Sequence, residues 1–317
     1  MSVSFHIKNK KKFFGYEKVL TVGEVIDLCK EYKLSIYNID FNADDFNKEK
    51  FYNTSIESWQ ENHSCILFGV EGKSVRGFEF SYNTTKNSYV IREFTPASEN
   101  DWFIVLEFMK VLSEKLNSKI LSEQREIFTS GTINTYDYKS DIKSGIKAIL
   151  DLLNKENEKG FNVDNIYGIK RPVSFDKEII ERIVNSSDEI KEFSKFCENI
   201  QYIDAYLAKQ FFVDDKEHNK KWAYYVLIEN LRTVLPYKPN VEIFSMNYIK
   251  NEEVAFWKIF FCAYKVDENG EEGFDKIGES IYDDFIKRLP SNKYKFIDAS
   301  YIVVEPLNKD EILEILK

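Results

Sequence analysis

The chain has 317 residues, and its 44 basic and 53 acidic side chains give a net charge of −9. This balance argues against a general binder of nucleic-acid backbones, because such proteins concentrate positive charge. Hydrophobic residues make up 43% and charged residues 31% of the chain, as in a folded protein, and a chain of this length needs neither disulfides nor metals to build a core.

The residue types favour packing over chemistry. The 26 Phe, 19 Tyr and 4 Trp contrast with 3 His, 12 Gly and 6 Pro, and aromatic side chains dominate cores and interfaces. The four cysteines are scattered among apolar residues, as reduced buried thiols are. No apolar run has the length of a signal peptide or a membrane span. We therefore expect a cytoplasmic protein without a membrane partner.

A strand and a helix open the chain. Residues 4–7 predict a strand, and Thr21, with Glu24 three residues later, forms a capping box that predicts a helix start. The lysine run at 8–12 predicts a solvated hairpin turn, and a local basic patch is the alternative.

A meander and a long helix are predicted next. Strand-like runs at 65–70, 75–82 and 89–94 are joined by short polar loops, which predicts antiparallel pairing because parallel neighbours need a longer crossover. Ser98 then caps a helix whose apolar residues, between Trp102 and Ile120, share one face. We expect that face to cover the meander.

A charged stretch at 155–160 follows a predicted helix at 141–154 and marks a candidate domain boundary. We expect two similar-sized halves, 1–158 and 159–317, or one continuous domain. Because both halves run from strands to a helix to a strand, a duplication is a further hypothesis. The second half is predicted to hold helices at 176–184, from 188, at 274–289 and from 308, and strands at 203–213, 222–234, 241–244, 254–266 and 299–304. The predicted fold class is α+β, with antiparallel β-meanders packed against helices.

Strong catalytic signatures are missing from the sequence. It has no Gly-x-Gly-x-x-Gly, P-loop, His-Glu-x-x-His, Cys-x-x-Cys or Gly-x-Ser-x-Gly. This argues against nucleotide-fold enzymes, zincins and α/β-hydrolases, and it implies no cofactor. Chemistry built from scattered carboxylates leaves little local signature and stays open.

Three residues are the candidates for a metal site. Asp214, Asp215 and His218 lie within five positions, in a stretch that could hold a divalent cation through carboxylate oxygens. The stretch lacks a turn glycine and lies between two strand-like runs, so a polar hairpin loop is the competing interpretation.

Other pairs have structural interpretations. His63 and Cys65 are the closest base and thiol, but extended residues two apart lie about 6.6 Å from each other, beyond hydrogen-bonding distance. The acidic pairs Asp44-Asp45 and Asp283-Asp284, and the polar stretch 129–132, fit a loop or a solvated helix face.

Several patterns resemble an uncharacterised bacterial family of similar length, filed as a domain of unknown function. They are Phe5-His-Ile-Lys-Asn-Lys, Val75-Arg-Gly-Phe-Glu79, the stretch from Tyr89 through Thr95-Pro-Ala-Ser98 to Asp101-Trp102, and Tyr136-Asp-Tyr138 with Gly145. The resemblance covers nearly the whole chain and implies no activity.

The expected function is that of a non-catalytic cytoplasmic binding protein. Tyr and Trp are enriched at interfaces and negative charge steers basic partners, so the expected partner is a basic protein and not a nucleic acid. An immunity-type protein that neutralises such a partner is the sharper form, and a metal-dependent hydrolase using clustered carboxylates is the alternative. The tyrosines that could form a partner face in the second half are Tyr202, Tyr206, Tyr224, Tyr225, Tyr237, Tyr248 and Tyr264.

Overall fold

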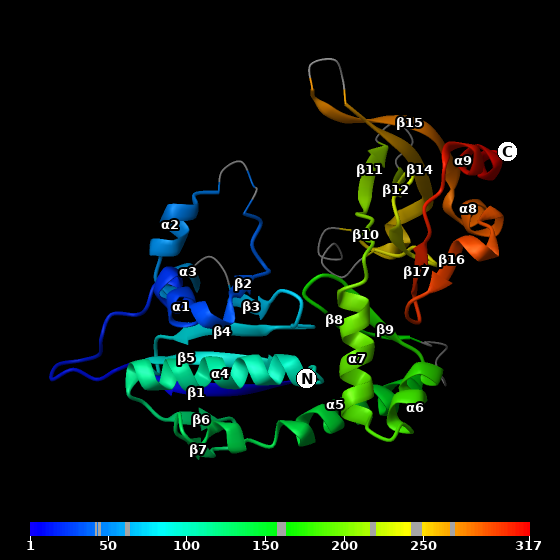
Figure 1. Cartoon of the computed structure of the whole chain (residues 1–317). Coiled ribbons are helices and arrows are strands. Elements are labelled where there is room, and N and C mark those ends of the chain that lie inside the picture. Colours follow the sequence, from blue (N-terminus) through cyan, green and yellow to red (C-terminus); the bar gives the residue numbers. More distant parts are fainter. Residues whose placement is uncertain are drawn as a thin grey trace. The chain divides into compact units, whose positions relative to one another are not determined.

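The structure is a computed structural model that describes residues 1–41, 43, 46–60, 64–156, 163–215, 220–241, 249–266 and 270–317. The chain divides into two compact units, Met1–Tyr202 and Ile203–Lys317. Helices pack against sheets that are largely antiparallel, so the fold class is α+β, as predicted (Figure 1).

The first unit is built on a seven-stranded sheet. Its strands are β1 (Ser2–Lys8), β2 (Leu34–Ile36), β3 (Ile66–Val70), β4 (Phe78–Asn83), β5 (Ser88–Phe94), β6 (Ile120–Ser122) and β7 (Ile127–Phe128). They lie in the order β2-β3-β4-β5-β1-β6-β7, and every neighbouring pair is antiparallel. The predicted meander is therefore confirmed, since β3, β4 and β5 are consecutive in the sheet. A separate hairpin pairs β8 (Asp164–Tyr167) with β9 (Pro172–Phe175).

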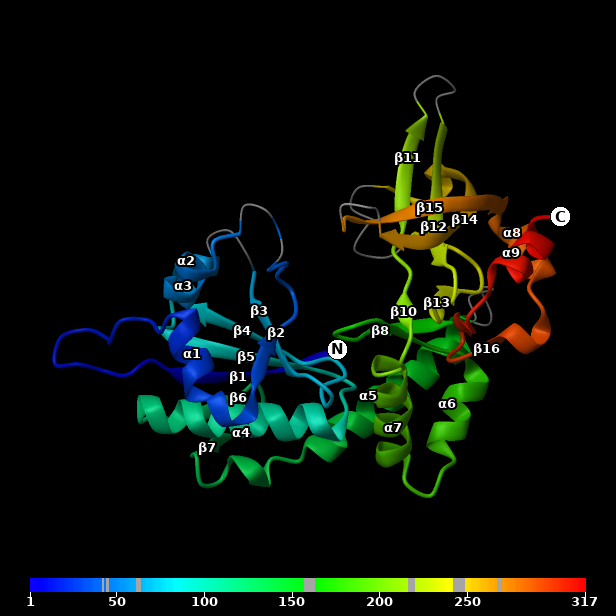
Figure 2. The ribbon, with the colours of Figure 1, turned by 45° about the horizontal axis from the view of Figure 1, so that its top comes forward.

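One long helix covers the inner face of this sheet. The helices of the unit are α1 (Val22–Leu28), α2 (Lys48–Asn53), α3 (Ile56–Gln60), α4 (Glu99–Leu116), α5 (Tyr138–Glu156), α6 (Lys177–Val184) and α7 (Glu189–Gln201). The Phe108 ring of α4 lies 4.8 Å from Phe78 and 5.1 Å from Phe80, both on β4. Figure 2 shows α4 running along one face of the sheet. This packing confirms that α4 covers the meander.

Caps fix the helix starts that the sequence predicts. Thr21 and Ser98 each form a capping box, and Asp176 and Asp188 accept a backbone N–H at the starts of α6 and α7. Ile120, predicted at the end of α4, lies instead in β6, because Asn117 adopts a left-handed conformation that ends the helix.

In its described residues, the second unit holds two four-stranded sheets and two α-helices. Its strands are β10 (Tyr206–Leu207), β11 (Phe211–Asp215), β12 (Lys220–Ile228), β13 (Thr233–Pro236), β14 (Val254–Val266), β15 (Glu272–Ile281), β16 (Tyr294–Phe296) and β17 (Tyr301–Val304), and its helices are α8 (Tyr282–Arg288) and α9 (Lys309–Leu316). One sheet has the order β10-β13-β17-β16 and the other β11-β12-β14-β15. The core lies between sheet and helices, where Tyr225, Phe261, Phe285 and Ile312 are fully buried.

The predicted helix at 274–289 is wrong in its first half. Residues 272–281 form β15, which pairs antiparallel with β14, and only Tyr282–Arg288 is helical. The apolar spacing of Phe274, Ile277 and Ile281 fits a helix, but the long pairing partner decides the conformation. Gly278 serves this strand, because a Cβ there would lie 2.4 Å from the Leu316 side chain of α9.

Two predictions about organisation have different outcomes. The boundary between 158 and 159 falls within residues 157–162, outside the described residues, and stays a prediction. The duplication hypothesis is wrong, because the strand orders differ: the meander of the first unit is antiparallel throughout, whereas β12 pairs parallel with β14. The predicted strand at 241–244 also lies largely outside the described residues.

Candidate functional site

The outer face of the β11-β12-β14-β15 sheet carries stacked aromatic rings. Along β12 the side chains alternate, so Ala223, Tyr225 and Leu227 are buried against the core while Trp222 and Tyr224 point to the opposite, half-exposed face. We call this opposite surface the aromatic face. It is made by Phe211, Trp222, Tyr224, Phe256, Lys258, Phe260, Tyr264, Phe274, Lys276 and Glu279.

The rings form a row across the strands. Phe211 of β11 stacks on Tyr224 of β12 at 5.0 Å between centroids, and Tyr224 stacks on Phe260 of β14 at 4.4 Å. A second stack joins Trp222 to Phe256 at 5.7 Å. Cross-strand aromatic pairs of this kind stabilise a sheet, but they also leave broad apolar area open to a partner.

Two lysines lie over the rings and share one carboxylate. The Lys276 ammonium lies 4.3 Å from the Phe260 centroid, and that of Lys258 lies 5.2 Å from the Trp222 centroid. Both pair with Glu279, and these hydrogen bonds lower the pKa of its carboxyl group below the usual value. The face therefore already binds cations, through ring faces and through one anion.

The most exposed part of the aromatic face lies at the far end of β14 and β15. The Tyr264 ring contacts Phe274 at 5.8 Å, and the two side chains are 51% and 57% exposed. The Tyr264 hydroxyl donates a hydrogen bond to the Glu272 carboxylate, which raises the pKa of the tyrosine. Two open rings beside a carboxylate suit an Arg or Lys side chain.

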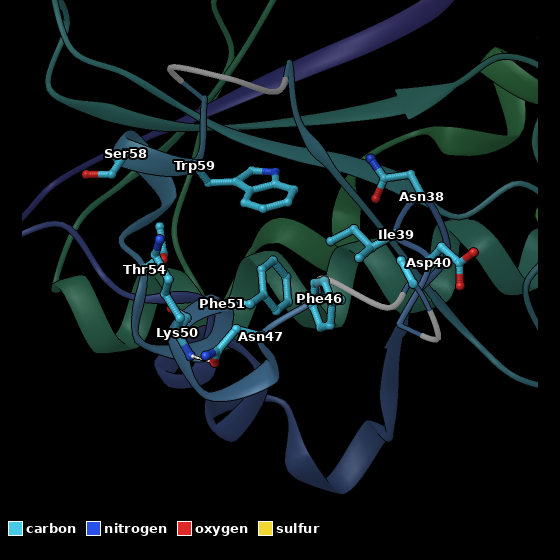
Figure 3. A pocket seen from close by; sticks show the side chains of 11 residues that line it. Asn38, Ile39, Asp40, Phe46, Asn47, Lys50, Phe51, Thr54, Ser58 and Trp59 are labelled. Carbon is cyan, nitrogen blue, oxygen red and sulfur yellow. Dashed lines mark hydrogen bonds between the residues drawn. The ribbon is translucent and has the colours of Figure 1, made fainter.

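A cavity of about 680 Å³ in the first unit is a second candidate site (Figure 3). Its apolar wall consists of Ile39, Phe46, Phe51 and Trp59, with Phe51 lying 5.5 Å from Phe46 and 4.9 Å from Trp59 between ring centroids. This size and lining suit a small apolar molecule.

Most polar groups at this cavity are committed to the fold. The Asn38 amide joins Cys65 and Leu67 of the β3 segment, and Asn47 caps α2 at the Lys50 N–H. The Lys50 ammonium has no ion pair among the described residues. A ligand would find apolar area here but few groups to orient it, so the aromatic face is the better-defined site.

Two buried carboxyl groups lie beside the start of α4. Asp101 accepts the backbone N–H groups of Val75, Arg76 and Gly77 at 3.0–3.1 Å. Among the described residues, the two Glu93 side-chain oxygens have no hydrogen-bond partner, and the charges that act on this carboxyl group are those of Asp101 and Arg76. Burial raises the pKa of both carboxyl groups, that of Glu93 well above its usual value. Both are fully enclosed, which suits a role in stability.

The predicted metal candidates are only partly described. Asp214 and Asp215 lie on β11 directly across from Lys221 and Lys220 of β12, whose charges oppose a bound cation. His218 lies outside the described residues, and within those residues no group of three or more His, Cys, Asp or Glu is arranged for a metal ion. The site at Asp214, Asp215 and His218 stays a prediction.

The remaining candidates have structural surroundings. His63, Asp44 and Asp45 lie outside the described residues, while burial raises the pKa of the Cys65 thiol, which opposes its activation as a nucleophile. Residues 129–132 form a turn in which the Thr129 N–H donates to the Thr132 hydroxyl at 2.9 Å. Asp283 and Asp284 begin α8, where Asp284 pairs with Lys287.

The chain is thus an α+β protein in which one sheet carries stacked aromatic rings on its outer face. A family model described as a domain of unknown function, DUF4299, matches residues 2–315, so the chain belongs to that family, as the sequence resemblance indicated. No match was found among curated proteins or among solved structures. Among the described residues, no helix has the length and apolar character required to cross a bilayer.

The sequence indicates the tyrosines of the second half as candidates for a partner face, but it does not distinguish the exposed ones from the buried ones. Tyr224 and Tyr264 lie on the aromatic face, whereas Tyr225 is buried in the core and Tyr248 lies outside the described residues. Trp222, Phe256 and Phe260 were missed as site residues. They could have been found from the sequence, because β12 and β14 are apolar at both odd and even positions. A sheet that buries only one face needs apolar residues only at alternate positions.

Proposed function

We propose that the protein is a non-catalytic binding protein and that its aromatic face binds a basic protein partner in the cytoplasm. The observation that carries the proposal is the stacked row from Phe211 through Tyr224 to Phe260 on the solvent side of a sheet. The side of a sheet that faces solvent normally carries polar side chains, and contiguous exposed aromatic area marks interaction sites.

Charge supports the choice of a basic partner. Residues 203–317 contain 16 basic and 21 acidic side chains, a net charge of −5. A second copy of the same unit would bring like charge to this face, and a nucleic acid would bring more negative charge. A basic protein gains from steering, and its Arg and Lys side chains fit the open rings of Tyr264 and Phe274 beside Glu272.

The test compares three forms of the full chain as immobilised bait. The wild type should retain a basic protein from the native lysate at near-physiological salt and release it at high salt, because exposed charges are screened. The Tyr264→Ser/Phe274→Ser variant should lose that protein. Phe103→Ser is the matched control, since Phe103 is 58% exposed on α4 of the first unit.

Capture from a lysate does not by itself establish direct binding to the aromatic face. The retained protein must then bind as a purified component in a defined stoichiometry, and cross-links should fall on β14 and β15. Retention by the double variant, or capture of acidic proteins only, contradicts the proposal. For an immunity-type protein, addition of the wild type should abolish an activity of the partner, and the double variant should leave that activity intact.

A further inference from the structure

A basic β-hairpin, residues 9–17, projects from the first unit where the chain leaves β1. In Figures 1 and 2 it is the blue loop that extends beyond the sheet before α1. Lys11 bridges to Tyr16, the Glu17 N–H donates to the Lys10 carbonyl at 2.8 Å, and the Lys12 N–H donates to the Gly15 carbonyl at 3.0 Å. The backbone therefore forms an ordered hairpin, with Gly15 in the left-handed conformation that closes its turn.

The base of the hairpin is tied to the sheet. Asn9 is 3% exposed, its backbone N–H donates to the Asn87 carbonyl at 2.9 Å, and its side-chain amide donates to the Glu17 carbonyl at 2.7 Å. The Asn9 side-chain oxygen in turn accepts the Lys10 N–H at 2.8 Å. One buried side chain thus joins both strands of the hairpin to the body of the unit.

The tip exposes two aromatic rings. Phe13 is 95% and Phe14 86% exposed, more than any other large hydrophobic side chain of the described residues, and their rings contact each other edge to face at 4.8 Å. The two side chains bury little area within the chain, so their contribution to folding is small. An apolar pair held at the end of an ordered projection is suited to entering another apolar phase.

Positive charge is concentrated along the hairpin. Residues 8–18 contain five lysines and one glutamate, a net charge of +4 in a chain whose total is −9. Glu17 pairs with Lys10 at 3.3 Å, whereas Lys8, Lys11, Lys12 and Lys18 have no ion pair among the described residues. Lys11 and Lys12 directly precede the two open rings, while Lys8 and Lys18 lie at the base of the hairpin. The hairpin therefore offers positive charge and apolar rings, which match the negative headgroups and the underlying acyl chains of an anionic lipid surface.

We propose that this hairpin docks on an anionic lipid surface, with Phe13 and Phe14 entering the headgroup–acyl boundary and the flanking lysines contacting the phosphates. The sequence predicts no membrane partner, and the proposal departs from that expectation without requiring a spanning helix. A nucleic acid would satisfy the lysines but would leave this edge-to-face ring pair without parallel faces for stacking bases. The proposal is independent of the aromatic face and its partner.

The test is sedimentation of the full chain with vesicles. With phosphatidylcholine vesicles containing a minority of phosphatidylglycerol, the wild type should bind at low salt and dissociate at high salt, and it should bind pure phosphatidylcholine about tenfold less well or worse. Phe13→Ser/Phe14→Ser should weaken binding about tenfold or more, because the apolar contact is lost. Lys11→Gln should weaken it about fivefold.

Phe103→Ser, which removes an exposed ring from α4, is the control and should bind like the wild type. Insertion is read separately with a Phe14→Trp variant, whose added indole fluorescence should be quenched by lipids brominated on the acyl chain. Equal binding to neutral and anionic vesicles, unchanged binding of the double serine variant, or an added fluorescence that the brominated lipids leave unquenched overturns the proposal. Tighter binding to a duplex DNA probe, with the same loss in the double variant, assigns the hairpin to nucleic acid instead.

Discussion

In the first unit, the outer face of the sheet on β1, β4 and β5 carries Ser2, Ser4, His6, Glu79, Ser81 and Arg92, with Val90 and Phe94 as its apolar members. In the second unit, the corresponding face of β11, β12, β14 and β15 carries stacked aromatic rings. The inner faces do not differ in this way: Phe80 in one unit and Phe261 in the other are both fully buried.

This contrast distinguishes an effect of the overall amino-acid composition from a requirement for aromatic side chains on one particular face. A general excess of Phe and Tyr would place several aromatic side chains on both outer faces, yet on β1, β4 and β5 of the first unit Phe94 is the one aromatic side chain of that face, and Arg92 pairs with Glu79 across it. The aromatic side chains of the second unit therefore need a local explanation. Binding of a partner is such an explanation, because removing a broad apolar surface from water is energetically favourable.

The largest effect is expected on the inner faces, where the two units should behave alike. Phe80→Ala and Phe261→Ala should each lower the free energy of unfolding by about 3–5 kcal/mol, because each removes a buried ring and leaves a cavity. Chemical denaturation measures the loss. Phe103→Ala, at an exposed position, is the control. If either core variant lost as little free energy of unfolding as the control, the two inner faces would not be equivalent.

Asp101→Asn should have the next largest effect. An amide offers one acceptor oxygen where the carboxylate serves several N–H donors, so buried donors of the 75–77 turn lose their partner. We expect a loss of about 2–3 kcal/mol in the free energy of unfolding. Ser98→Ala, which removes only the capping hydroxyl of α4, should cost about 1 kcal/mol. An Asp101→Asn variant as stable as wild type would show that these hydrogen bonds contribute little.

Glu93→Gln should stabilise the protein, and the gain should grow with pH. Burial raises the pKa of Glu93 in the folded state above its unfolded value, so the unfolded chain releases the proton first and folding stability falls as the pH rises above about 4.3. Each unit of pKa difference corresponds to about 1.4 kcal/mol. Denaturation midpoints at acidic and neutral pH measure the effect.

The matched control for Glu93 is Glu114→Gln on the exposed side of α4. It should leave the free energy of unfolding within about 0.5 kcal/mol of the wild-type value, because the side chain is exposed. A Glu93→Gln variant that is less stable than wild type at neutral pH would mean that the ionised carboxylate is favoured where it lies, contrary to its surroundings.

The smallest stability effect is expected on the aromatic face itself. Phe211 is 41% exposed on an edge strand, so Phe211→Thr should cost no more than about 0.5–1 kcal/mol while it removes one end of the stacked row. Thermal unfolding measures the cost. A loss comparable with that of Phe261→Ala would show that the aromatic face is a structural layer, and it would remove the main difference between the two sheets.

Local signals account for what the sequence predicts well. Thr21, Ser98, Asp176, Asp188 and Asn308 each accept a backbone N–H at a helix start, and this chemistry depends only on residues a few positions away. The meander from β3 to β5 follows from short loops and alternating burial. These features require no knowledge of distant partners.

The features that could not be predicted from the sequence depend on pairing between distant segments. The parallel contact of β12 with β14 and the conversion of 272–281 into a strand are set by registers that no local pattern encodes. The aromatic face has the same origin: Trp222 and Tyr225 are both aromatic, and only the packed core decides that Tyr225 points inward. In the hairpin at 9–17, Phe13 and Phe14 follow the lysine run, but their exposure depends on the closing turn.

The position of Lys258 and Lys276 over the rings has a consequence for affinity. A basic partner meets a surface on which tethered cations already contact Trp222 and Phe260, so binding exchanges one cation–π contact for another. The net gain in binding free energy is the difference between two similar cation–π contacts, because Lys258 and Lys276 compete with the partner for the same rings. Selectivity should then favour guanidinium over ammonium, because a planar, weakly hydrated group stacks on a ring better than the lysine it displaces.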